Sequence, residues 1–488
     1  MRINPVLFLF ILIFGLIVLV IGINVPFALL LLAAGLSYLL SFKYTLKGFP
    51  WILFLLSFLV RLGYILAVDT PPVSDFKTMF EAGLSFAQGD YSFSLDRYFS
   101  QWAYQTAFVA YEGTVIKLFG EAQALLILKL LNGLFSSATF LFVYLILKNY
   151  VSEKVSRFFA LFGSFFIFPL TFVTVLSNQQ LSTFLILAGL FFFTEKNITL
   201  RPWVRGFITG LLLALGNIIR PEGMLLIGAL TVFFILRLIN PRQERRGAIL
   251  SKAAFLFAAY FCLNLLVSQW IIQAGVNPQG LKNNNFLYKF VVGLNHDTMG
   301  VYSVEDMEAL YSRDLSQEER EQLEWELIGQ RLSKGPGKLL ALFLSKQQLL
   351  WGGNPVVWSY QHLLEAGKPV GLMGIAIPIE LVGELLWRLH NLQIYLLILL
   401  SVIGGIFLLK GPMNHYFVIF YLVLLVSAAA YLVVEIQPRY IYLQEILFIL
   451  TSAIGLEGVL QRLSPKPKSQ GPVLPLRDTE STNHLTLL

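Results

Sequence analysis

The chain has little charge and almost no cysteine. Its 488 residues include one cysteine and five histidines, and only 13% of them are charged. Cys262 lies in an apolar run, so no intramolecular disulfide can form. The histidines are scattered, and the sequence has no P-loop and no H-E-x-x-H motif. These absences argue against a disulfide scaffold, a structural metal site and a nucleotide site.

Apolar residues take the place of the missing charge. They make up 56% of the chain, whereas a soluble domain is usually about a quarter charged. The formal net charge is +7, but the basic residues are spread over short loops and form no patch, so no nucleic-acid partner is expected. The sequence therefore predicts an all-α polytopic membrane protein embedded in a lipid bilayer.

Apolar runs recur along the chain at lengths that could cross the hydrocarbon core. We expect about 12 transmembrane helices, with the first retained and not cleaved as a signal peptide. The expected spans are 5–23, 26–42, 50–68, 122–147, 158–176, 181–195, 206–219, 221–236, 253–273, 393–409, 415–434 and 440–460. One apolar stretch, 206–236, could be one span or two. We count two, because a single span would place the basic segment 237–252 outside.

Lysine and arginine outnumber acidic residues in every loop that this arrangement places inside. We expect the chain to lie in the plasma membrane. The positive-inside rule then places both termini in the cytoplasm and the two long segments on the outer face. The expected organisation is three spans (1–68), an outer catalytic loop with interfacial helices (69–121), spans four to nine (122–273), an outer soluble or interfacial segment (274–392), three last spans (393–460) and a disordered cytoplasmic tail (461–488).

Helical patterns interrupt both outer segments. Apolar residues recur at helical spacing in 76–86 and in 108–119, which predicts two amphipathic helices that lie along the interface. An acidic helix is expected over 304–333, beginning with a capping box from Ser303 to Asp306. Segments 338–350 and 371–389 are also predicted to be interfacial.

A few polar residues lie at the outer ends of spans or inside them. Asp75 follows Pro71 and Pro72, and it either caps the next helix or presents a carboxylate near the membrane surface. Arg439 lies in a short outer turn, where it could be a headgroup anchor or an anion ligand. Arg220 has the same two interpretations, and the short span before it should sink it below the headgroups. Two basic residues inside spans, Arg61 and Lys129, are each expected to face the protein interior and pair with an acidic group, or to snorkel.

Short motifs in chain order resemble the GT-C superfamily of membrane glycosyltransferases, in particular bacterial relatives of the protein O-mannosyltransferases and of the aminoarabinose transferase that acts on lipid A. The resemblance covers most of residues 50 to 460, and its specificity comes from order and topology. The motifs are Arg61-Leu62-Gly63, Ser74-Asp75-Phe76, Gly83 to Gly89 with Asp90-Tyr91, Tyr98-Phe99, Tyr104-Gln105, Leu118-Phe119-Gly120, Ser177-Asn178-Gln179, Ile219-Arg220-Pro221-Glu222 and Gln437-Pro438-Arg439-Tyr440.

The resemblance implies a transferase that takes a sugar from a polyprenyl-phosphate donor to an acceptor hydroxyl, with inversion at the outer face. It makes Asp75 the catalytic base. Phe76 stands where many members have a second acidic residue, which leaves Asp96 or Glu81 as a candidate second acid. Donor phosphate binding falls to Arg439 and Arg220, and substrate binding to Lys77, Tyr104, Gln105 and Tyr440. No metal ligand is assigned, and a divalent cation is left open as a cofactor.

Two other functions fit a polytopic membrane protein. A transporter or lipid flippase would have two related halves, and we find no internal repeat. A non-catalytic partner in cell-envelope assembly would use 274–392 as a binding domain. The sequence leaves open whether the acceptor is a glycolipid, an envelope polymer or a protein.

Overall fold

The structure is a computed structural model that describes residues 25–43, 47–195, 199–241, 244–311, 315–372, 375–410 and 416–463. The first expected span, 5–23, and nearly all of the tail lie outside the described residues. The longer helices in the first half are α2 (Val25–Tyr38), α3 (Phe49–Ala67), α4 (Ser74–Ala87), α6 (Thr106–Phe119), α7 (Glu121–Leu147), α8 (Glu153–Ser164), α10 (Gln179–Thr194), α11 (Pro202–Ile219), α12 (Gly223–Ile239) and α13 (Arg246–Gln273). The second half adds α14 (Phe286–Gly293), α15 (Val304–Tyr311), α16 (Gln317–Leu332), α17 (Pro336–Gly352), α19 (Ile379–Lys410), α20 (Val418–Val433) and α21 (Tyr442–Leu463).

Short elements connect these helices. The five-residue helices are α5 (Arg97–Gln101), α9 (Ile167–Thr171) and α18 (Gln361–Glu365), and 3-10 turns include η3 (Ala103–Gln105) and η6 (Pro438–Ile441). Strands β1 (Val370–Leu372) and β2 (Ile375–Ile377) form an antiparallel pair in the described part of the chain.

Most of the expected spans coincide with apolar helices. Within the described residues, 6 helices are long and apolar enough to cross a membrane, or 7 if the bent pair Glu153–Ser164 and Ile167–Thr174 is one span. Four shorter apolar helices, Leu29–Phe42, Gln179–Thr194, Gly223–Ile239 and Val418–Val433, coincide with further expected spans. The all-α membrane class is confirmed, whereas the number of about 12 spans is not reached by this measure.

Two glycines allow α11 and α13 to pack backbone against backbone. A Cβ atom at Gly206 would lie 2.2 Å from the carbonyl oxygen of Lys252, and one at Gly210 would lie 2.2 Å from that of Leu256. Small residues four positions apart let membrane helices approach in this way. The contact fixes α11, whose C-terminal end carries Arg220.

The two basic residues inside spans are accommodated differently. The Lys129 ammonium lies 2.9 Å from a carboxylate oxygen of Asp69, which confirms the expected acidic partner. Arg61 is fully buried and donates to the hydroxyl groups of Ser57 and Ser136 and to the Ser164 carbonyl. Arg61 thus faces the protein interior as expected, but no acidic side chain among the described residues contacts it, so the expectation of an acidic partner is wrong.

The first outer segment forms the two expected helices, α4 and α6. A Cβ atom at Gly113 would lie 2.9 Å from the Gly83 carbonyl oxygen, so the helices are in close contact. The acidic stretch 304–333, by contrast, is two helices, because the capping box forms between Ser316 and Glu319 at the start of α16. Ser303 does accept from the Asp306 backbone N–H, but the Asp306 carboxylate pairs with Arg331.

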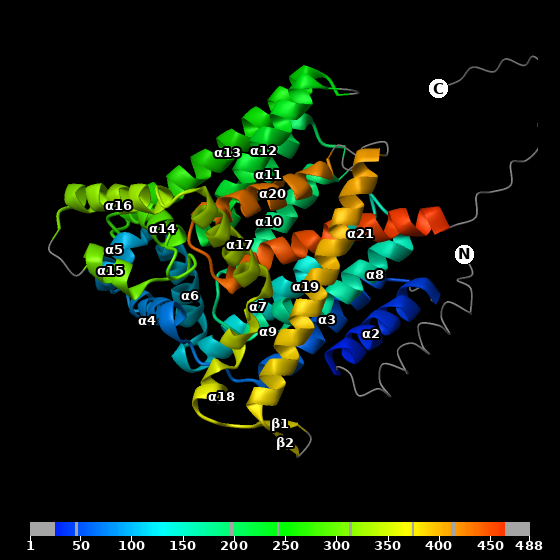
Figure 1. The fold of residues 1–488 in the computed structure, drawn as a ribbon, viewed down its shortest axis with the longest axis horizontal. Helices are drawn as coiled ribbons and strands as arrows, with labels where there is room; N and C mark the ends of the chain where they lie inside the picture. The colour runs from blue at the N-terminus through cyan, green and yellow to red at the C-terminus, as the bar shows by residue number, and fades with distance from the viewer. Residues whose placement is uncertain are drawn as a thin grey trace, which may run out of the picture.

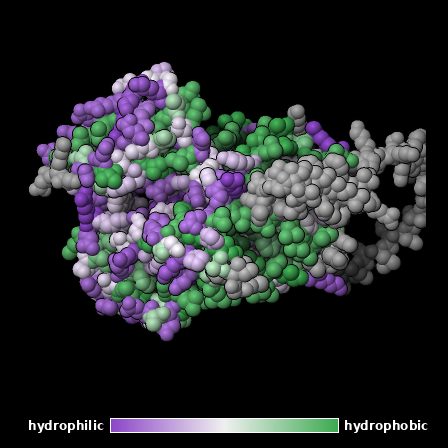
Figure 2. Space-filling model, turned by 60° about the horizontal axis from the view of Figure 1, so that its bottom comes forward, coloured by the Kyte–Doolittle hydropathy of each residue, from purple (hydrophilic) through white to green (hydrophobic). Residues whose placement is uncertain are grey.

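Segment 371–389 includes most of the antiparallel pair β1 and β2 and the start of α19, and its interfacial position stays a prediction. Several elements of the two long segments, 69–121 and 274–392, lie together at one end of the molecule. Figure 1 shows α4, α5, α14, α15 and α16 at the left, and α2 with the C-terminal end of α21 at the right. In Figure 2, hydrophilic residues cover much of that left-hand end, and hydrophobic residues dominate farther to the right. The polarity of the surface therefore changes along the long axis of the protein.

Candidate active site

Asp75 lies in the first turn of α4, at the polar end of the protein. Val73 occupies the N-cap position, and no side chain caps this helix. Ser74 has a φ of 52°, which places it in the left-handed region, a strained conformation for a residue with a Cβ atom. The capping interpretation of Asp75 is therefore wrong, and its carboxylate is directed to another part of the chain.

The Asp75 carboxylate meets the Arg439 guanidinium from a turn 364 residues away. Oδ2 of Asp75 lies 3.4 Å from a terminal nitrogen of Arg439, with 45% of the Asp75 side chain but only 10% of the Arg439 side chain exposed. Arg439 also donates to Gln437 at 2.7 Å and lies over the rings of Phe76 and Trp358, 4.9 and 4.7 Å from their centroids. The guanidinium is thus fixed by its surroundings, while the carboxylate remains accessible.

Arg220 also packs against Tyr440, with its guanidinium 5.5 Å from the ring centroid. It forms an ion pair with Glu222 and donates to the side-chain oxygen of Asn178 at 3.0 Å. The Asn178 amide in turn donates to Gln105 at 3.2 Å. The structure therefore brings the Arg220 turn, the Asn178 turn and the first outer segment together beside η6.

Lys289 on α14 belongs to the same cluster, although sequence reasoning missed it. Its ammonium forms an ion pair with Glu435, and the Glu435 backbone N–H donates to the Lys289 carbonyl at 2.7 Å. The Glu435 carboxylate also accepts from Gln437 at 3.1 Å and from Tyr440 at 3.4 Å. Burial acts to raise the pKa of Glu435, but Lys289, the hydrogen bond from Gln437 and the charge of Arg439 hold it below its usual value. A single lysine in the apolar run Phe286–Gly293 is the signal that could have identified it.

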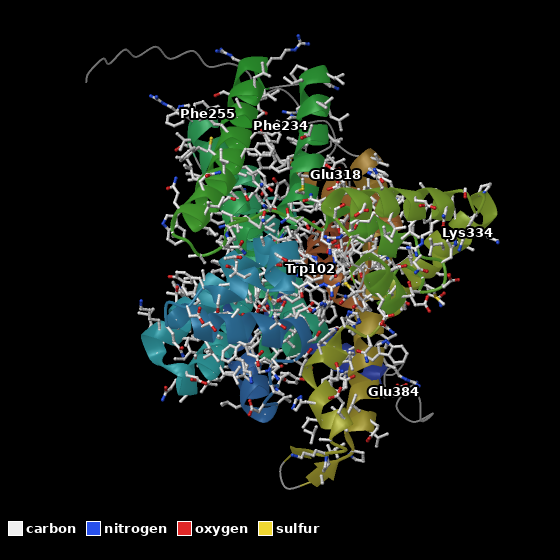
Figure 3. The ribbon with its side chains drawn as sticks, turned by 90° about the vertical axis from the view of Figure 1, so that its left-hand side faces the viewer. Trp102, Phe234, Phe255, Glu318, Lys334 and Glu384 are labelled. Atoms are coloured by element: carbon white, nitrogen blue, oxygen red, sulfur yellow. The ribbon has the colours of Figure 1, made fainter. Side chains whose placement is uncertain are left out.

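Tyr104 lies in η3 within the electrostatic reach of these charges. Burial raises the pKa of its phenol, the positive charges of Lys289 and Arg220 oppose that shift, and Asp75 adds to it. The backbone N–H of Tyr104 donates to the backbone carbonyl of Lys282 at 3.2 Å, and this hydrogen bond joins η3 to the second outer segment. In Figure 3, the neighbouring Trp102 lies near the centre of the view, below Glu318 and above Glu384. Both outer segments therefore contribute to the site.

Three predicted residues lie apart from this cluster. Lys77 and Glu81 pair with each other at 3.7 Å, one helical turn apart, and their side chains are 62% and 60% exposed. Asp96 is exposed at the start of α5, where its backbone carbonyl accepts from Ser100. Within the described segments, none of the three has a hydrogen bond or ion pair with Asp75 or Arg439. No group of three or more His, Cys, Asp or Glu side chains that could hold a metal ion occurs there either.

The three ion pairs of the site differ in how accessible the carboxylate is. Glu222 and Glu435 have side chains only 9% and 3% exposed, so the charges of Arg220 and Lys289 are satisfied inside the protein. Asp75, at 45%, is the exposed member of the third pair. An incoming anion could therefore replace Asp75 at Arg439 more readily than it could displace either buried carboxylate.

No protein-family model and no curated protein matches the chain. Among solved structures, the archaeal oligosaccharyltransferase AglB from Archaeoglobus fulgidus, in complex with an inhibitory peptide and a dolichol-phosphate, is similar over 86% of this chain with 13% sequence identity and a TM-score of 0.48. The apo form of the Archaeoglobus fulgidus oligosaccharyltransferase matches over 90% of this chain with 12% identity and a TM-score of 0.42. The matched regions span 51% of those chains, so this chain corresponds to about half of their length.

Proposed function

We propose that the chain is a membrane glycosyltransferase of the GT-C type, which transfers a sugar from a polyprenyl-phosphate donor to an acceptor hydroxyl on the outer face of the membrane. The observation that carries the proposal is the pairing of an accessible carboxylate, Asp75, with a buried and immobilised guanidinium, Arg439. A transferase of this kind needs a proton acceptor and a phosphate ligand in one place. Nucleotide sugars are cytoplasmic, so a lipid-linked donor suits a site on the outer face.

The donor phosphate would bind Arg439 by charge-assisted hydrogen bonds and would displace the Asp75 carboxylate from it. Asp75 is then free to accept the proton of the acceptor hydroxyl. The acceptor oxygen forms a bond to the anomeric carbon, the bond from that carbon to the phosphate oxygen breaks, and polyprenyl phosphate leaves. The configuration at the anomeric carbon is inverted, and Arg439 stabilises the charge on the leaving phosphate.

The neighbouring groups have supporting roles in this scheme. Arg220 packs against the ring of Tyr440, Lys289 pairs with Glu435 beside it, and Tyr104 and Gln105 present polar groups from the first outer segment. Lys77 has no contact in the described structure that supports a role in substrate binding. The acceptor is proposed to be a glycolipid, an envelope polymer or a protein.

The test is to incubate the purified protein, reconstituted in liposomes, with a radiolabelled polyprenyl-phosphate sugar and the candidate acceptors. We expect label to appear on an acceptor in equal amount to the free polyprenyl phosphate released. Asp75→Asn should lower the rate of both by about 100-fold or more, whereas Asp90→Asn, at an exposed carboxylate in the same segment, should leave both unchanged. Movement of intact donor across the bilayer without cleavage would instead support the flippase alternative, and absence of both activities would favour an assembly partner.

A further inference from the structure

A further buried cation, Lys346, contacts the segments that carry the site. Lys346 on α17 is fully buried, and its ammonium donates to three backbone carbonyls, those of Gly293 at 2.6 Å, Leu432 at 2.9 Å and Val434 at 2.8 Å. No carboxylate among the described residues lies within ion-pair distance of it. A buried ammonium without an ionised partner costs considerable free energy, so an apolar residue at this position would have been the simpler choice for packing.

The three carbonyls belong to the two segments that carry the charges of the site. Gly293 ends α14, the helix that bears Lys289. Leu432 and Val434 lie at the end of α20, immediately before the turn 435–440 that bears Glu435 and Arg439. One ammonium group thus joins α17 to both of these segments.

Close packing leaves little freedom at this junction. A Cβ atom at Gly293 would lie 2.3 Å from the Val433 carbonyl oxygen, and one at Gly300 would lie 2.7 Å from Cε of Lys346. The Gly300 carbonyl also accepts from the backbone N–H of Ile436 at 2.9 Å. Gly300 has a φ of 77°, which favours glycine. The lysine side chain therefore passes between backbones that cannot separate without breaking these contacts.

We propose that Lys346 is a positioning residue, which holds turn 435–440 and the end of α14 in the arrangement that places Arg439 beside Asp75. This inference rests on the proposed function, because it concerns the same site. A displacement of about 1 Å in a catalytic arrangement can cost about 100-fold in rate. Loss of the three hydrogen bonds should therefore reduce turnover although Lys346 touches no substrate.

The charge of Lys346 gives the role a pH dependence. Burial lowers the pKa of its ammonium to about 7, and the negative charge of Glu435 opposes the shift. Glu435 itself faces Lys289 from α14. Because its pKa is lowered to about 7, Lys346 in the folded protein loses its positive charge as the pH rises through that value. The neutral amine that remains has two N–H groups in place of three and donates weaker hydrogen bonds to the three carbonyls. Turnover should fall over the same range.

The experiment compares Lys346→Met and Lys346→Arg with Lys338→Met, the same substitution at an exposed lysine on the same helix. Each full-length variant is checked for folding by size-exclusion chromatography. Transfer rates are then measured between pH 6 and pH 9, and hydrogen exchange of peptides covering 432–440 is measured by mass spectrometry without any donor. Lys346→Arg retains the charge at every pH, so it remains informative if Lys346→Met does not fold.

We expect Lys346→Met to lose about 10- to 100-fold in turnover and to exchange faster over 432–440 than the Lys338→Met control. Lys346→Arg should recover part of the turnover and should lack the decline above pH 7. Turnover, pH profile and exchange equal to those of the control would overturn the inference. If the wild-type protein shows no transfer, the proposed function fails, but the exchange measurement still decides whether Lys346 holds the turn.

Discussion

Replacing Asp75 with asparagine separates catalysis from structure at this site. Asparagine has nearly the same shape as aspartate, and its side-chain oxygen can still accept a hydrogen bond from Arg439. It cannot serve as a base near neutral pH. Since Asp75 makes no helix-capping hydrogen bond in the structure, the substitution removes no capping interaction and isolates the chemistry of the carboxylate.

The expected magnitudes differ enough to be told apart. The ion pair with Arg439 has a carboxylate that is 45% exposed, and exposed pairs contribute about 0–1 kcal/mol to stability. Loss of a general base lowers turnover by about 100-fold or more, which corresponds to about 2.7 kcal/mol in the activation free energy. Arg439 retains its bond to Gln437 and its aromatic contacts, so donor binding should persist.

The assay measures transfer from a polyprenyl-phosphate sugar under single-turnover conditions, with donor binding measured separately by the thermal shift that the donor causes. Asp90→Asn is the matched control from the same outer segment. Turnover of Asp75→Asn within a few-fold of the wild-type value, with donor binding intact, would refute the assignment of Asp75 as base and would direct attention to Asp96 or Glu81.

Three further predictions concern the donor, the membrane orientation and the outer helices. Arg439→Lys should raise the donor KM and retain only part of the wild-type activity, because lysine cannot form a bidentate contact with phosphate. Arg388→Ala, which removes an arginine from an exposed ion pair, is the control. An unchanged donor KM in Arg439→Lys would contradict the role of Arg439 as a phosphate ligand. In a chain without Cys262, an impermeant thiol reagent added outside should label Glu318→Cys and not Arg245→Cys; labelling of both from one side would exclude the topology. Burial raises the pKa of Glu324 from 4.5 to about 7. Between these two values the Glu324 carboxyl is protonated in the folded state and ionised in the unfolded state, so the free energy of unfolding should fall as the pH rises through about 7. Glu324→Gln should remove that decline in Tm, and an identical decline in both proteins would exclude Glu324 as its cause.

The sequence predicted where most of the long helices lie, but it did not predict where they end or where they are interrupted. Apolar length predicts α3, α7, α13 and α21, because membrane helices satisfy their own backbone hydrogen bonds. It does not predict that α19 begins at Ile379, since polar residues occur in its first turns. The break between α15 and α16 follows from a capping box at Ser316, which competes with an equally plausible one at Ser303.

Partners of charged groups were harder to predict than their positions. Lys129 follows the expectation of an acidic partner, whereas Arg61 is satisfied by hydroxyl and carbonyl groups. A guanidinium has five N–H donors, so several weak acceptors on neighbouring helices can replace one carboxylate. Ser57 lies one turn away on the same helix, but Ser136 and Ser164 come from distant parts of the chain, and a single sequence gives no indication of which helices will be neighbours.

The same limitation explains which parts of the candidate site could be predicted. Asp75, Arg220 and Arg439 stand out because each is a charged residue at the end of an apolar span. Lys289 and Lys346 lie in the apolar parts of outer helices, where a lysine usually extends toward solvent. The structure shows instead that one is paired with Glu435 and the other is held by three carbonyls. Both contacts converge on the segment that leads to Arg439, so the position of this arginine depends on the outer helices as much as on the spans that flank it.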